Sequence, residues 1–244
     1  MELKRQQIIA YALKYQGEYA QVLKAISAQE AYENPGNLAA ITIVDDDYPA
    51  NFWLLRYPPL CLFYLGDRTL LQDKLVAIVG SRQASDESLE LTKIIVKNLK
   101  NDYDIVSGLA RGIDGCSHRA ALACGKKTIG ILANGINFCY PQEHRDLYRT
   151  MTQEHLVLSE YPGLTAPLRN HFPFRNRLIA ALAAKLIIPA AQRRSGTMIT
   201  VDIALELNKD VYCVKLNNKE ERGSEYLIEQ GANLLESIAQ IREL

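Results

Sequence analysis

The chain has 244 residues, 48% of them hydrophobic and 23% charged, a composition typical of a soluble globular protein able to bury a sizeable core. Its 28 Lys and Arg residues equal its 28 Asp and Glu residues, so net charge indicates no class of partner and any electrostatic argument must be local. No run reaches the length of a membrane span, no secretory signal opens the chain, and the five cysteines lack a C-x-x-C pair. We therefore expect a cytoplasmic protein with reduced thiols and no membrane partner.

The N-terminal residues predict a short helical segment. Apolar residues recur at helical spacing over residues 3–28, and Gly17 divides this stretch into two helices. A turn containing Pro and Gly follows, so we expect residues 1–36 to form a reduced helical N-terminal segment and residues 37–244 to form the main domain. Where the two join, residues 36–74 are expected to be a linker-like, partly ordered arm.

From Lys74 onward, short β-rich runs alternate with helical patterns. The predicted strands are 75–80, 103–107, 128–134, 156–160, 184–190 and 210–215, and helices are predicted at 85–100, 114–124, 173–184 and 197–208. Near-continuous apolar strands separated by helices are typical of a parallel sheet covered on both faces. The sequence thus predicts an α/β fold, an extended Rossmann-like, mostly parallel sheet with a core at about residues 74–236. Such sheets bind ligands beyond the carboxyl ends of their strands, where the strand order switches.

A small turn follows the first of these strands. Gly80 and Ser81 let backbone amides approach an anion closely, and Arg82 adds a planar cation. The alternative is a plain strand-to-helix loop with a surface arginine. In either case Ser85 is expected to cap the next helix, with acidic residues in its first turn.

The loop after the second strand, residues 107–114, contains Gly108 and Gly112, whose backbone amides are suited to form an anion nest. Asp114 is the expected N-cap of the following helix. The loop matches neither G-x-G-x-x-G nor a Walker A sequence, so a nucleotide cofactor is compatible with the fold but no fingerprint supports one.

Positive charge is concentrated in residues 161–201, which contain no Asp or Glu. The basic residues there are Arg169, Arg175, Arg177, Lys185, Arg193 and Arg194. In a chain of zero net charge, such a stretch indicates binding of a polyanion.

Within this stretch, HFPFRNR (171–177) predicts the start of a helix, since Pro173 suits a first turn. Arg175 and Arg177 are expected in that first turn, where cations oppose the helix dipole, so anion binding explains them better than local stability. The alternative is that both arginines pair with carboxylates elsewhere. Phe172 either stacks on an unpaired base or belongs to the core.

Residues 195–197 open another predicted helix that has no acidic residue before Asp202, which suits a phosphate, although capping explains the same residues. Catalytic patterns are weak. The histidines lack metal-ligand spacing, no G-x-S-x-G is present, and no carboxylate pair is spaced for acid–base work. His118 is expected to be packed or hydrogen-bonded inside a helix, and the chain is expected not to be an enzyme.

These segments, in this order, resemble the DprA/Smf family of DNA-processing proteins. The matching motifs are VAIVGSR (76–82), IVSGLARGID (105–114), HRAAL (118–122), YPQEHRDLY (140–148), LSEYP (158–162), HFPFRNRLIAAL (171–182), RSGTMIT (194–200) and RGSEYLIEQGANLL (222–235), with DDDYP (45–49) and LFYLGD (62–67) upstream. The resemblance implies an extended Rossmann-like fold, a homodimer, and binding and protection of single-stranded DNA. It also implies delivery of that DNA to the recombinase RecA during natural transformation.

The family places a basic DNA pocket at these motifs. Combining the resemblance with the residue patterns, the expected DNA-binding residues are Gly80, Ser81, Arg82, Ser107, Gly108, Ala110, Arg111, Gly112, Asp114, Arg169, Phe172, Arg175, Asn176, Arg177, Ser195, Gly196 and Thr197. We expect no metal and no cofactor at this pocket.

The chain departs from the family pattern at Ala190, where many members have Glu, and at Lys215-Leu216, where Pro-Gly is usual. The segment before residue 45 predicts a reduced helical cap, and no winged-helix domain is expected at the C-terminus. The alternative is a nucleotide-binding enzyme related to lysine-decarboxylase-like phosphoribohydrolases. RSGTMIT lacks the glycine pair and the glutamate of their P-G-G-x-G-T-x-x-E motif. A dinucleotide-dependent oxidoreductase is disfavoured because the fingerprint is missing.

Overall fold

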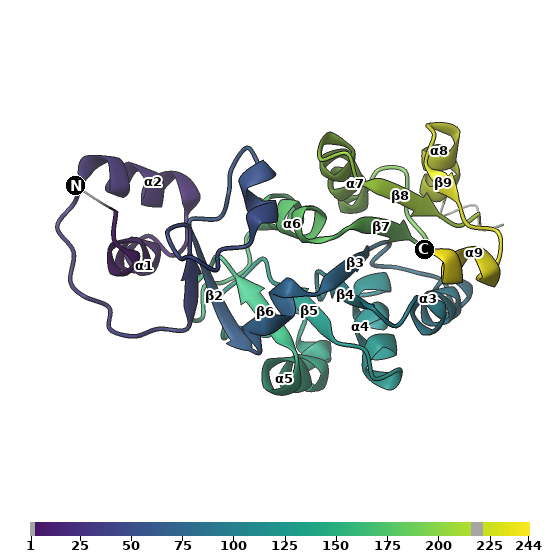
Figure 1. The fold of residues 1–244 in the computed structure, drawn as a ribbon, viewed down its shortest axis with the longest axis horizontal. Coiled ribbons are helices and arrows are strands. Elements are labelled where there is room, and N and C mark those ends of the chain that lie inside the picture. Colours follow the sequence, from purple (N-terminus) through teal and green to yellow (C-terminus); the bar gives the residue numbers. More distant parts are fainter. Residues whose placement is uncertain (1–2, 216–221) are drawn as a thin grey trace.

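The computed structural model describes residues 3–215 and 222–244, and in these residues nine strands form one sheet (Figure 1). The strands are β1 Ala40–Thr42, β2 Cys61–Gly66, β3 Lys74–Ile78, β4 Tyr103–Ser107, β5 Thr128–Ile131, β6 Leu156–Ser159, β7 Lys185–Ile188, β8 Asp210–Cys213 and β9 Asn233–Leu234. The α-helices are α1 Arg5–Lys14, α2 Tyr19–Ala28, α3 Asp86–Asn98, α4 Ile113–Ala123, α5 Arg145–Glu154, α6 His171–Leu182, α7 Gly196–Glu206, α8 Gly223–Glu229 and α9 Ile238–Glu243. Three 3-10 turns complete the elements: η1 Ala50–Leu54, η2 Arg68–Gln72 and η3 Gln142–His144.

The strand order is β1-β2-β6-β5-β4-β3-β7-β8-β9. Every neighbouring pair from β6 to β9 is parallel, which confirms the predicted Rossmann-like sheet. The chain adds β4, β5 and β6 on one side of β3 and then returns to pair β7 with its other side. The strand order therefore switches between β3 and β7, and a ligand site is expected at their carboxyl ends.

The predicted linker-like arm over residues 36–74 was wrong. β1 and β2 lie in this region and extend the sheet as antiparallel strands, β2 pairing with β6. β1 is short and pairs with β2, and β2 joins the sheet through β6, a distant part of the chain, so local composition did not reveal them. Leu216, one of the positions at which the chain departs from the family pattern, lies outside the described residues.

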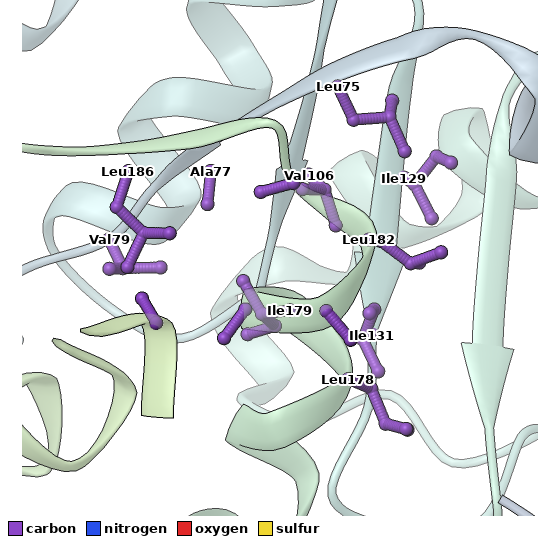
Figure 2. Close-up of a cluster of buried hydrophobic side chains, with 14 of the residues drawn as sticks. Leu75, Ala77, Val79, Val106, Ile129, Ile131, Leu178, Ile179, Leu182 and Leu186 are labelled. Carbon is purple, nitrogen blue, oxygen red and sulfur yellow. The ribbon is translucent and has the colours of Figure 1, made fainter. Parts of the chain in front are cut away.

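Helices cover both faces of the sheet, as predicted. Alternate residues of β3 point in opposite directions, so Leu75 and Ala77 pack in the layer that contains α6, whereas Val76 and Ile78 pack in the layer that contains α3. Figure 2 shows the first layer, in which side chains of α6 lie against the central strands. This packing fixes the start of α6 relative to the ends of the strands.

The N-terminal helices pack on the sheet near its β1 edge, over β1, β2 and β6. Ile8, Ile9 and Tyr11 are fully buried in one cluster with Phe63 and Val157. Each such side chain contributes about 1.5–3 kcal/mol when it is fully buried. The segment is therefore anchored to the main sheet. None of the helices in the described ranges is both long and apolar enough to cross a membrane.

Candidate functional site

A pocket of about 810 Å³ opens at the carboxyl ends of the central strands. The loops after β3, β4, β5 and β7 line it together with the start of α6, so it lies at the switch in strand order. Of the expected DNA-binding residues, the structure brings fourteen into this lining: Gly80, Ser81, Arg82, Gly108, Ala110, Arg111, Asp114, Arg169, Phe172, Arg175, Asn176, Ser195, Gly196 and Thr197.

Three helices begin at the pocket. α4, α6 and α7 each contribute first-turn residues to the lining. In none of the three does the side chain of the N-cap residue accept a hydrogen bond from the first-turn amides. Ser195, the N-cap of α7, donates its hydroxyl to the carbonyl of Gln192 at 2.8 Å instead of capping the helix. Uncapped first-turn amides and the positive ends of helix dipoles both favour an anion at this position.

The charge of the lining is strongly one-sided. The charged residues are five arginines, Arg82, Arg111, Arg169, Arg175 and Arg194, and one carboxylate, Asp114. Arg82, Arg169 and Arg194 are exposed and form no ion pair with any described carboxylate. Arg111 pairs with Glu143 at 3.0 Å, but both side chains are exposed and such pairs contribute little to stability. Four cations are thus accessible to an anionic ligand.

An aromatic rim accompanies these cations. Phe172 is half-buried and lies outside the core clusters, its ring centroid 4.8 Å from the guanidinium carbon of Arg82 and 6.0 Å from the ring centroid of Tyr140. Tyr140 is 42% exposed. The structure therefore places Phe172 at the pocket rather than in the core, with a ring face beside a cation.

Arg175 lies at the floor of the pocket, where only 3% of its surface is exposed. Its Nη1 donates to the carbonyl oxygens of Gly108, at 2.7 Å, and of Ile131. Its Nε donates to Asn176 Oδ1 at 3.1 Å, and the amide of Asn176 donates to the carbonyl of Gly196 at 3.1 Å. Arg175 thus joins the β4 and β5 loops, and through Asn176 the start of α7.

Burial dominates the electrostatics of this floor. It lowers the pKa of Arg175 to about 10, although Asp114 opposes that shift. It also raises the pKa of the Asp114 carboxyl above its usual value, although Arg175 and the backbone amides of Ala110 and Gly80 favour the ionised form. For both groups desolvation outweighs mutual attraction, which is the usual balance for buried charges.

Two glycines permit the close approach of the loops. Gly112 has a φ of 70°, and a Cβ at this position would collide with the carbonyl oxygen of Ser81. A Cβ on Gly108 would collide with the guanidinium of Arg175. Between them, Leu109 adopts a left-handed φ of 54° while its side chain is fully buried. The loop is therefore held in a conformation that most residues avoid.

The anion-binding explanation was wrong for Arg177. Its guanidinium is buried and bound in bidentate fashion by Glu160, at 2.6 and 2.7 Å, and it stacks 3.7 Å from the ring centroid of Phe174. It lies outside the pocket lining. Arg177 therefore follows the alternative explanation, pairing with a carboxylate from another part of the chain, Glu160, which directly follows β6. α6 also begins at His171, so Arg175 and Arg177 lie beyond its first turn.

Three further predictions are corrected or refined. Asp114 is not the N-cap of α4: Gly112 holds that position, and Asp114 is in the first turn. Ser107 is fully buried and donates its hydroxyl to the carbonyl of Ile78 at 2.6 Å, so it supports the strands and does not line the pocket. Gly112 also lies outside the lining and serves the loop contact described above. The predicted cap Ser85 of α3 is confirmed.

The lining also contains residues that sequence reasoning left out of the site, namely Asn134, Tyr140, Gln192 and Arg194. Tyr140 opens the YPQEHRDLY motif, and Arg194 belongs to the basic stretch and to RSGTMIT, but neither pattern by itself marks the residue as part of the site. His118 is packed as predicted, fully buried with Nδ1 2.7 Å from Thr128 Oγ1. Within the described residues no group of three or more His, Cys, Asp or Glu residues is placed to hold a metal ion.

Comparisons with known proteins agree with this geometry. The sequence profile of the family described as DNA recombination-mediator protein A matches residues 39–244. The DNA processing protein DprA of Streptococcus pneumoniae is 39% identical over 200 residues, covering 81% of this chain and 71% of that protein. DprA of Bacillus subtilis is 37% identical over 247 residues, covering 98% of this chain and 81% of that protein.

Solved structures share the fold. The crystal structure of DprA from Streptococcus pneumoniae superposes with a TM-score of 0.83 at 33% identity, covering 98% of this chain and 93% of that one. DprA from Helicobacter pylori, whose structure is described as showing a single-stranded DNA binding mode, superposes with a TM-score of 0.77 at 31% identity, covering 85% and 95%. Because the profile and these relatives span most of the chain, this protein belongs to the DNA recombination-mediator protein A family, the family of DprA and Smf.

Proposed function

We propose that this chain binds single-stranded DNA in the pocket at the β3–β7 switch. The observation that carries the proposal is the pocket lining, which contains the exposed cations Arg82, Arg169 and Arg194 and the ring of Phe172, with Arg82 beside that ring. Phosphate contacts position a strand without reading its sequence, and an aromatic face stacks on any unpaired base. The relative from Helicobacter pylori, described as binding single-stranded DNA, supports the same role here.

The test is a binding titration with a fluorescent thymidine oligonucleotide, alone and as a duplex, at several salt concentrations. We expect tighter binding of the single strand and a loss of affinity as salt rises, because each neutralised phosphate releases counterions. Arg82→Ala should weaken binding to every sequence, whereas Arg149→Ala, which removes an exposed arginine of α5 outside the pocket, serves as the matched control. Equal affinity for duplex and single strand, or an Arg82→Ala protein that binds like wild type, would refute the proposal.

We further propose that the protein protects incoming DNA and helps load RecA recombinase onto it during natural transformation, acting in the cytoplasm as a homodimer. The family description as a recombination mediator supports this role. Light scattering at micromolar concentration tests the dimer, and a monomer mass would count against it. The rate at which RecA assembles on protein-coated single strands, with and without this chain, tests the loading.

The proposal is for binding rather than catalysis. Asp114 is the one carboxylate among the lining residues, and it is buried beside Arg175 with backbone amides as partners, a poor arrangement for general acid–base work. Incubation with nucleoside monophosphates should release no base. Sustained release by highly purified protein, abolished by Asp114→Asn, would restore the phosphoribohydrolase alternative.

A further inference from the structure

A second surface that is both aromatic and basic lies near the start of α6, outside the pocket. It consists of Tyr19, Arg56, Tyr57 and Phe174, which we call the tyrosine patch. The ring centroids of Tyr19 and Tyr57 are 5.7 Å apart, those of Tyr19 and Phe174 5.7 Å, and those of Tyr57 and Phe174 6.4 Å. The rings come from α2, from the loop after η1 and from α6, and η1 packs against α6 (Figure 1).

The patch faces solvent. Tyr57 is 43% exposed and Tyr19 and Phe174 are half-buried, with Tyr19 packing against the core under the N-terminal helices. The exposed guanidinium carbon of Arg56 lies 5.2 Å from the Tyr57 ring centroid, and this side chain forms no ion pair among the described residues. The patch therefore offers partly exposed aromatic rings and an unpaired cation together.

The buried side chain of Arg177 holds the patch in place from the protein interior. Arg177 stacks on Phe174 and donates its Nε to the carbonyl of Tyr57 at 2.8 Å, which ties the loop after η1 to α6. The charge of Arg177 is neutralised by Glu160, leaving Arg56 as the cation that the patch presents to solvent. A surface fixed in this way loses little conformational entropy when a ligand binds.

The patch and the pocket lie on different sides of the start of α6. Phe172 and Phe174 are two positions apart on α6, so their side chains point about 200° apart around the helix. Pro173 lies between them, exposed and in the pocket lining. A ligand that leaves the pocket over Pro173 needs to cross only the end of one helix, about 10–12 Å wide, to reach the patch.

We propose that the tyrosine patch is a second stacking site for the same DNA strand, occupied by nucleotides next to those held in the pocket. This inference rests on the proposed function. The rings of Tyr57 and its neighbours stack on bases, and Arg56 holds a phosphate. Through Tyr19, the N-terminal helical segment then contributes directly to the DNA surface.

The test compares a thymidine hexamer with a thymidine 20-mer on the full chain. Tyr57→Ala should weaken binding of the 20-mer at least about fivefold, the low end of what losing one stacked base costs. Arg56→Ala should weaken it too and should reduce its salt slope by about 0.7, because one phosphate contact is lost. Both variants should leave hexamer binding unchanged. Tyr57→Phe should retain wild-type affinity because it keeps the ring. The matched control is Tyr32→Ala, which removes a ring of similar exposure, 39%, that packs on Tyr11.

Arg56→Ala removes no packed ring, so it keeps the test valid if Tyr57→Ala melts at a lower temperature. Unchanged 20-mer affinity in Arg56→Ala and in folded Tyr57→Ala would overturn the second site, and so would an equal loss for both lengths, since that loss would mean the patch only supports the pocket. Failure of the proposed function has a different signature, because the hexamer would then bind Arg82→Ala as tightly as wild type.

Discussion

Replacing Arg175 by methionine is expected to destabilise the fold rather than to remove a phosphate contact. The guanidinium lies at the pocket floor and donates to the carbonyls of Gly108 and Ile131 and to the side chain of Asn176. Methionine fills much of the volume but donates no hydrogen bond. Three acceptors would lose a donor, and the buried carboxylate of Asp114 would lose a neighbouring cation.

The expected magnitude follows from these losses. Leaving three buried acceptors without a donor and a buried carboxylate without a nearby cation should cost about 3–5 kcal/mol, the cost of removing one partner from a buried charged pair. For a domain of this size each kcal/mol shifts the melting temperature by about 2–4 °C, so Arg175→Met should melt about 6–20 °C below wild type.

Urea denaturation and thermal melts followed by circular dichroism measure this loss. Arg82→Met is the matched control, because it removes an exposed arginine of the same pocket and should change the free energy of unfolding by less than about 0.5 kcal/mol. Adding Asp114→Asn to Arg175→Met should recover about 1–3 kcal/mol, because the uncompensated charge is then gone. An Arg175→Met protein of wild-type stability that binds DNA weakly would refute the reasoning.

Three further outcomes are expected. Phe172→Ala should weaken single-strand binding by about 1–3 kcal/mol without changing its salt dependence, and thermal melts should show a nearly unchanged fold because the ring lies outside the core. Arg177→Met should cost about 3–5 kcal/mol in urea denaturation because it leaves Glu160 buried and unpaired, and Glu160→Gln in the same protein should restore part of that loss. Burial lowers the pKa of His118 to about 3, whereas its unfolded pKa is about 6.5, so its contribution to stability should be lost as pH falls from about 6.5 toward 3, by up to about 1.4 kcal/mol per pH unit. His118→Gln should flatten that slope in urea titrations at pH 7 and pH 5.

The central sheet was predictable because its signals are local. Apolar runs such as 75–80 mark strands buried on both faces, and Ser85 marks the start of α3 by capping it. β1 has only three residues, and β2 pairs with β6, which lies almost a hundred positions later in the chain. A strand whose identity depends on so distant a partner leaves little trace in its own sequence.

In the site, too, contacts between segments that are distant in the sequence could not be predicted. A window that begins at residue 161 contains no acid, yet Glu160, the partner of Arg177, lies one position before it. Which arginine turns inward depends on packing around α6 and not on charge counting. Tyr140 was missed for a related reason, since its contact with Phe172 joins segments that the sequence separates.

The division of the arginines into buried and exposed groups has a measurable consequence. A buried cation such as Arg175 is already bound by protein acceptors, so it neutralises no phosphate and releases no counterion from the DNA. Arg82, Arg169 and Arg194 are exposed, so each can neutralise a phosphate and release counterions. For single strands each phosphate contact contributes about −0.7 to the slope of log affinity against log salt. With Arg111 kept on Glu143, the other three exposed arginines predict a slope of about −2, and Arg56 would bring it to about −3 on a long strand. Between 50 and 200 mM salt, affinity for a hexamer should therefore fall about 20-fold. A slope much steeper than −3 per protomer would mean that the buried arginines also turn outward to phosphates, and would overturn the division of roles argued from their contacts.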